Sequence, residues 1–145
     1  MSIFLGGTGS ANELDDYEKG SFTIGFQGAT EPSWFNKTAT YVKVGQLVHI
    51  DMWLQASSTT NSTASIFFDL PFVASSTSNR PTSSVARCYG LRNWGSQRTA
   101  YGFLVAGSSA LNMMWVGTGS NPSNMNMNLW TSGGEIHVSI SYRTN

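Results

Sequence analysis

The feature that most constrains this chain is a period-two alternation of apolar and polar residues, which is clearest near its C-terminal end. In the stretch GGEIHVSISYR, every second residue from Ile136 to Tyr142 is apolar, and the residues between them are His or Ser. Successive side chains of a β-strand point to opposite faces, so this pattern predicts a strand with one buried face. We expect one face to carry Ile136, Val138, Ile140 and Tyr142, and the other His137, Ser139, Ser141 and Arg143.

The same alternation recurs along the chain, whereas helical periodicity is almost absent. Strands are predicted over 38–44 and 48–55, joined at Gly45-Gln46 as a β-hairpin, with Val48, Ile50, Met52 and Leu54 on one face. Phe22–Phe26 and a short run before Pro71 are further candidates. The others are Val85–Leu91, Ala100–Ala106, Leu111–Val116 and Met125–Trp130. These short strands, with no crossover helices between them, predict an all-β fold, a single antiparallel β-sandwich or jelly roll of about eight or nine strands.

Composition narrows the class of protein. A chain of 145 residues fits one domain, with a formal net charge of zero and 11% charged residues. A nucleic-acid binder needs a basic face, so this class is disfavoured. Cys88 is the only cysteine, which rules out an intrachain disulfide. No stretch approaches the ~20 apolar residues of a membrane span, and the N-terminus lacks a signal-peptide pattern. We therefore expect synthesis in a cytoplasm, without membrane insertion.

The acidic residues are concentrated near the N-terminus, in the stretch NELDDYEKGSFTIGF. Residues 1–20 contain four acids and one lysine, a balance of −3, and residues 21–145 contain four acids and seven bases, a balance of +3. An acidic segment before a mildly basic body predicts a docking arm over 1–20 and a folded knob over 21–145. Its expected docking residues are Ile3, Phe4, Leu5, Leu14, Asp15, Asp16, Tyr17 and Glu18. A calcium site is the alternative, but the Asp-x-Asp-x-Asp-Gly spacing is missing.

The same stretch resembles the LDDYEEGTWTP motif that opens the C-terminal head domain of tail fibres and other virion appendages of tailed bacteriophages. ATYVKVGQLVHIDMWL, FFDLPF and VSISYRTN are similar, in the same order, to later parts of that family. The resemblance implies a compact all-β head, usually a homotrimer, that is displayed on a virion and has no enzyme activity. In tail fibres the motif follows a long shaft, whereas eleven residues precede Asn12 here. The chain is therefore expected to be either an excised head or a small protein with its own way of attaching, and attachment through the N-terminal arm belongs to the second alternative.

Catalytic and metal sites are weakly indicated. His49 and His137 are the only histidines, and each falls on the polar side of its strand. They could meet across strands and, with Cys88, suggest zinc; exposed histidines and a buried thiol are the plainer interpretation. A Ser-His-Asp site has its residue types but no nucleophile-elbow sequence. The sequence therefore predicts no catalytic residue, no metal and no cofactor.

The aromatic residues suggest two kinds of contact. Flat rings beside hydroxyl and amide groups suit sugar binding, and the expected glycan or partner contact lies on one predicted hairpin loop: Arg92, Asn93, Trp94, Gln97 and Arg98. Alternatively, the rings fill the core and a subunit interface. The methionine-rich strands near the C-terminal third predict a trimer interface made of Met113, Trp115, Met125, Met127 and Leu129.

Three functions follow from these features. The first is a capsid decoration or cement protein, docked on the virion through residues 1–20. The second is the receptor-binding head of a tail fibre or spike that holds a host-surface glycan. The third is a free-standing lectin or glycan-active enzyme. The expected partners are further copies of the chain, other virion proteins and a host glycan.

Overall fold

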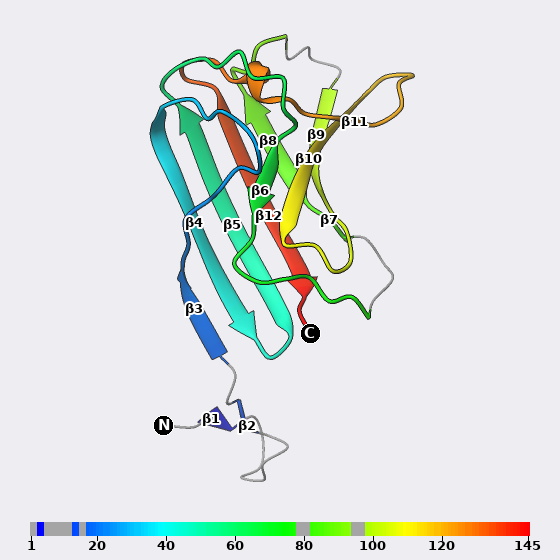
Figure 1. The fold of residues 1–145 in the computed structure, drawn as a ribbon. Coiled ribbons are helices and arrows are strands. Elements are labelled where there is room, and N and C mark those ends of the chain that lie inside the picture. Colours follow the sequence, from blue (N-terminus) through cyan, green and yellow to red (C-terminus); the bar gives the residue numbers. More distant parts are fainter. Residues whose placement is uncertain (1–2, 5–12, 15–16, 78–81, 94–97) are drawn as a thin grey trace.

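The computed structural model describes residues 3–4, 13–14, 17–77, 82–93 and 98–145. In these ranges the regular secondary structure consists almost entirely of antiparallel strands, which loops and turns connect (Figure 1). The strands are β1 (Ile3–Phe4), β2 (Glu13–Leu14), β3 (Tyr17–Ser21), β4 (Trp34–Val44), β5 (Leu47–Ala56), β6 (Phe67–Asp69), β7 (Thr82–Ser83), β8 (Val85–Tyr89), β9 (Arg98–Leu104), β10 (Ala110–Gly117), β11 (Ser123–Asn124) and β12 (Glu135–Arg143). A 3₁₀ turn, η2, spans Met127–Leu129. The described part of the chain contains no helix with the length and hydropathy of a membrane span.

Two five-stranded sheets face each other and form the sandwich. The first sheet has the order β3-β4-β5-β12-β8. The second has the order β11-β10-β9-β7, and β6 pairs with β10 as well. The remaining strands, β1 and β2, pair with each other. The expected all-β sandwich is therefore confirmed.

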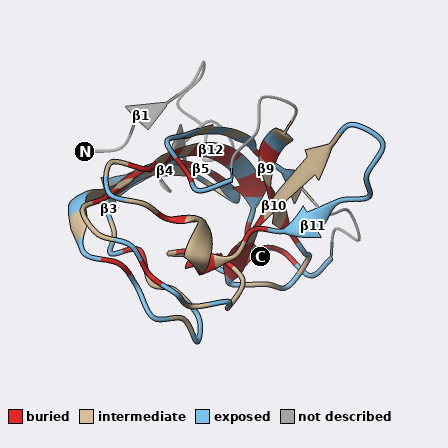
Figure 2. Cartoon of the chain, turned by 90° about the horizontal axis from the view of Figure 1, so that it is seen from above, coloured by how far each residue is buried: buried red, intermediate tan, exposed pale blue. Residues whose placement is uncertain are grey.

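The core lies between the sheets and follows the alternation of the sequence. On β5, the inward residues Val48, Ile50, Met52 and Leu54 are at most 3% exposed. The inward side of β12 is equally buried from Ile136 to Tyr142 (Figure 2). Phe68, Leu111 and Met113 close the core from the second sheet. Burial of these apolar side chains is the main favourable term that holds the sheets together.

The β4–β5 hairpin is confirmed, with a two-residue turn at Gly45-Gln46. Gly45 has a φ of 56°, and Gln46 is not among the residues with positive φ. Positive φ at the first central residue alone is the signature of a type II′ turn, which glycine adopts without steric cost. The turn sets the register of the hairpin, in which Val44 pairs with Leu47 and Tyr41 with Ile50.

Two predicted strands are absent. The run Phe22–Phe26 forms no strand; Phe26 makes one isolated bridge to Phe68, and Ile24 is buried in the core. The run Met125–Trp130 is also not a strand. Met125 and Met127 each donate a backbone hydrogen bond, to Met113 and Ala64 respectively, and η2 follows. In both segments the apolar residues fill the space between the sheets. The alternation of apolar and polar residues there reflects burial in the core and not pairing with a neighbouring strand.

The expected boundary between arm and body moves towards the N-terminus. Tyr17–Ser21 forms β3, an edge strand that pairs with β4 from Val44 to Thr40. The last residues assigned to the arm therefore belong to the first sheet. The acidic composition of this segment suggested a separate arm, whereas its backbone pairs with β4 as an edge strand.

The predicted trimer interface is wrong for its three methionines. Met113, Met125 and Met127 have 0% exposure and lie in the core, where no other subunit could touch them. Trp115 and Leu129 are partly buried and pack against the same core. The opposite side of β9 and β10 faces outward, and its half-buried apolar side chains are Tyr101, Phe103, Met114 and Val116.

A candidate binding groove on the outer face of the first sheet

The outer face of the first sheet carries a groove of about 360 Å³. Inward burial of the even-numbered residues of β5 and β12 leaves their odd-numbered residues pointing outward. Strand pairing then aligns two adjacent rows across β4, β5, β12 and β8. The first row is Thr38, Trp53, His137 and Arg87, and the second is Thr40, Asp51, Ser139 and Val85. The groove is thus assembled by the sheet itself, from strands far apart in sequence.

The centre of the first row is a pair of rings. The ring centroids of Trp53 and His137 are 5.5 Å apart, with planes 17° from parallel. Trp53 is 42% exposed, which is unusual for so large an apolar side chain. The exposed indole gives the groove a flat apolar floor that binding could cover.

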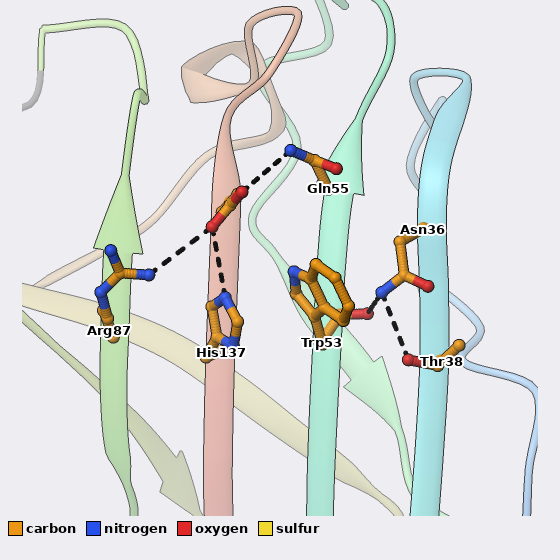
Figure 3. A network of polar contacts seen from close by, with 7 residues as sticks. Asn36, Thr38, Trp53, Gln55, Arg87 and His137 are labelled. Atoms are coloured by element: carbon orange, nitrogen blue, oxygen red, sulfur yellow. Dashed lines mark hydrogen bonds and ion pairs between the residues drawn. The ribbon is translucent and has the colours of Figure 1, made fainter.

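A polar network fixes the ring pair from one side, through the carboxylate of Glu135. Gln55 Nε2 donates to Glu135 Oε1 at 2.9 Å. The other oxygen, Oε2, lies 3.3 Å from His137 Nε2 and 3.5 Å from Arg87 Nη1. Figure 3 shows these contacts converging from β5, β8 and β12. The carboxylate therefore holds the orientation of both the imidazole and the guanidinium.

The backbone of Trp53 is held from β4 by Asn36. Its amide Nδ2 donates to the backbone oxygen of Trp53 at 3.1 Å and to Thr38 Oγ1 at 3.3 Å (Figure 3). This side chain also ties β4 to β5 close to the β-bulge between Trp34 and Asn36. The floor of the groove is consequently preorganised by contacts from both neighbouring strands.

A Ser-His-Asp arrangement joins the second row to the next row along the sheet, in which His49 is paired with Ser141. His49 Nε2 lies 3.2 Å from Asp51 Oδ2, and His49 Nδ1 lies 2.9 Å from Ser141 Oγ. Ser139 Oγ is 3.5 Å from His49 Nε2. All of these residues stand on regular, paired strands rather than on a sharp strand-to-helix turn of the kind that presents a nucleophilic serine. The arrangement supplies hydroxyl and carboxylate groups to one end of the groove.

The two histidines lie on the same face but do not meet. His49 is opposite Ser141 and His137 is opposite Trp53, a separation of four residues along β12, or roughly 13 Å. Cys88 is on the inward side, where burial raises the pKa of its thiol to about 12. Among the described residues no group of three or more His, Cys, Asp or Glu side chains is arranged to hold a metal ion. The zinc alternative has no assembled ligand set in this part of the chain.

The predicted glycan loop is only partly described. Arg92 and Asn93 are exposed in the turn after β8, and Asn93 has a φ of 55°. Trp94 and Gln97 lie outside the described residues. The guanidinium carbon of Arg98 is 4.1 Å from the centroid of the Trp115 ring, a cation–π contact that joins the two strands.

The predicted docking residues are also partly described. Ile3 and Phe4 pair with Leu14 and Glu13, and nothing further is described of their side chains. Leu5, Asp15 and Asp16 lie outside the described residues. Tyr17 points outward from β3 and is 50% exposed. Glu18 accepts a hydrogen bond from the hydroxyl of Tyr41, and this bond is the main cause of the raised pKa of Tyr41.

Of the residues that line the groove, His137 alone was a candidate from the sequence, and there as a metal ligand rather than as part of a binding surface. Trp53 follows three alternating apolar positions, but it stands on the polar side of its strand, between Asp51 and Gln55. A tryptophan on the polar side of an amphipathic strand is the feature of the sequence that indicates a binding surface here. Its partners His137 and Arg87 could be found only from the pairing of β5, β12 and β8.

Comparison of the chain with protein-family models, with curated proteins and with solved structures finds no significant match.

Proposed function

We propose that this protein is a non-enzymatic surface protein of a bacteriophage virion that binds a host-surface glycan in the groove of its first sheet. The virion context is carried by the resemblance of its N-terminal and hairpin stretches to phage head domains. The groove supports the binding role, and its volume of about 360 Å³ lies within the usual range of small-molecule sites.

One observation carries the glycan proposal: the partly exposed Trp53 ring, paired with His137 and bordered by hydroxyl and carboxylate side chains. The C–H face of a pyranose packs on a flat ring, while its hydroxyl groups need nearby donors and acceptors. Both kinds of partner are present within two rows of one sheet. Glu135 holds His137, against which the Trp53 ring stacks, and Asn36 holds the Trp53 backbone. Binding therefore costs little conformational entropy at this ring.

The test is adsorption of the purified protein to host cells, before and after enzymatic or chemical removal of surface polysaccharide. Wild-type protein should bind intact cells and lose binding on stripped cells. Trp53→Ala should lose most of the binding, whereas Phe35→Ala, which removes a 67%-exposed aromatic ring outside the groove, should not. Equal binding by wild type and Trp53→Ala would refute the role of the groove.

Capsid decoration is the second candidate, and a different observation favours it. Tyr17, Val44 and Leu47 form one outward row at the end of the first sheet nearest the β4–β5 turn, and they are 50%, 38% and 52% exposed. Adjacent exposed apolar side chains mark a protein contact. This row adjoins the N-terminal segment that the sequence suggests as a docking arm.

Electron microscopy of virions labelled with a Fab against this protein separates the two candidates. Label distributed regularly over the capsid favours decoration, and label confined to the tail favours the receptor-binding head. Removal of residues 1–16 retains β3 and should release a decoration protein from the capsid without unfolding it.

The homotrimer remains part of the proposal, on a different surface from the one the sequence suggested. The outward side of β9 and β10 offers Tyr101, Phe103, Met114 and Val116, with Asn112 beside them and no charged side chain in this group. This group of uncharged side chains can be buried against a further copy without desolvating an ion.

A further inference from the structure

We infer that the groove selects neutral saccharides and discriminates against acidic ones such as uronic acids. This inference rests on the proposed function, because it names the class of glycan that the same groove would take. It is argued from the charges around the ring pair and from the hydrogen-bonding capacity left free in the groove.

Carboxylates outnumber guanidinium groups around the floor of the groove. Asp51 lies within it, Glu135 borders it, and Arg87 is the only Lys or Arg side chain that lines it among the described residues. Arg87 is in addition held by Glu135 at 3.5 Å, so its charge is largely compensated. The carboxylate and guanidinium groups alone give two acids, Asp51 and Glu135, against one base, Arg87, a balance of −1. A carboxylate on a ligand would therefore meet net repulsion and would lose hydration without a free cation to replace it.

The hydrogen-bonding groups of the groove that have no partner suit the hydroxyl groups of a ligand. Only Oδ2 of Asp51 is engaged, by His49 at 3.2 Å, and in the described part of the chain Oδ1 has no partner. A carboxylate oxygen is an acceptor only, so it accepts a hydrogen bond from a sugar hydroxyl but forms none with a second carboxylate. Thr38, Thr40 and Ser139 add hydroxyls that either donate or accept. An uncharged polyol satisfies all of these groups at once.

The apolar floor of the groove also favours a neutral ligand. Trp53 is central in its row and stacks on His137, so a ligand there covers an uncharged ring rather than a cation. Val85, which is 81% exposed, extends this apolar surface at the edge of β8. The C–H face of a neutral pyranose fits such a surface, and an added carboxylate gains nothing from it.

The experiment measures binding of the whole protein to matched pairs of oligosaccharides by isothermal titration calorimetry and saturation-transfer NMR. Each pair has the same linkage and differs only in oxidation of the C6 hydroxymethyl to a carboxylate. The pairs are oligomers of glucose, galactose and mannose with the corresponding oligouronides. At least one neutral member should bind about tenfold tighter than its acidic counterpart, and Trp53→Ala should abolish this binding.

Asp51→Asn supplies the internal control, because it keeps the shape of the side chain and removes its charge. The preference for the neutral member should fall by about threefold in this variant. Trp53-dependent binding that is tighter for the acidic member would overturn the inference and leave the glycan function intact. If no member of any pair binds in a Trp53-dependent way, both the inference and the glycan function fail. An unchanged preference in Asp51→Asn would also overturn the inference, since the repulsion would then not come from this carboxylate.

Discussion

Trp53 and His137 lie opposite each other on β5 and β12, with ring centroids 5.5 Å apart and planes 17° from parallel. Both stand on the solvent side of strands whose other side forms the core. A stacked cross-strand pair on an exposed sheet face contributes to sheet stability and keeps both rings in a fixed orientation. The pair thus connects the stability of the sheet to the shape of the groove.

The coupling between these two rings is measurable. We expect Trp53→Ala and His137→Ala to be non-additive in the free energy of unfolding, with a coupling of about 0.5–1.5 kcal/mol. Chemical denaturation of the wild type, both single variants and the double variant gives this value. Trp53→Ala combined with Phe35→Ala is the control cycle and should be additive. A coupling near zero for the Trp53–His137 cycle would mean that the rings are oriented by their strands alone.

Glu135 is expected to act as a positioning residue for the groove. Glu135→Ala removes the common partner of Gln55, Arg87 and His137, and we expect about 1 kcal/mol lower stability, together with severalfold weaker glycan binding. Glu135→Gln keeps the side-chain length and its hydrogen-bonding oxygen, so it should recover most of the stability. Thermal melts and calorimetric titration measure the two effects separately. Full binding by Glu135→Ala would show that the ring pair needs no support from this carboxylate.

The sequence predicted the fold class, the β4–β5 hairpin and the buried sides of β5 and β12, because long regular alternation specifies which side of a strand is inward. Short apolar runs were less informative. In NMMWV two adjacent methionines leave the inward side undecided, and only the pairing with β9 shows that Met113 is inward and Met114 outward. The groove could not be predicted, because its rows depend on the register between strands that are distant in sequence. The polar-side position of Trp53 was the one local sign of it.

The two methionines give a matched pair of variants. Met113→Ala should lower the free energy of unfolding by about 2–5 kcal/mol, since it opens a cavity in the core. Met114→Asp should change stability less, but it should convert a trimer into monomers if the outward side of β9 and β10 is the subunit contact. Light scattering and denaturant titration distinguish these outcomes. A trimer that persists in Met114→Asp, at unchanged affinity, would exclude this face as the interface.

Stability should decline at alkaline pH because two protonated groups are buried. Burial raises the pKa of the Cys88 thiol from 9.0 to about 12, and it raises that of the Tyr142 hydroxyl from 10.0 to about 12. The folded state therefore retains these protons at pH values where the unfolded chain has released them. The sign follows directly: this stability is fully present below about pH 9 and is lost as pH rises through the folded pKa values.

Removal of the thiol provides the test. Between pH 9 and pH 11 the wild type should lose on the order of 2 kcal/mol from Cys88 alone, whereas Cys88→Ala should show a flatter decline. The remaining decline belongs in part to Tyr142, whose hydroxyl donates to the backbone oxygen of Phe72 at 3.0 Å. The same burial should make the thiol slow to react with an aromatic disulfide reagent at pH 8 in the native state, and fast in denaturant. Rapid native-state labelling, or an equal pH dependence for wild type and Cys88→Ala, would show that this thiol is accessible and ionises normally in the fold.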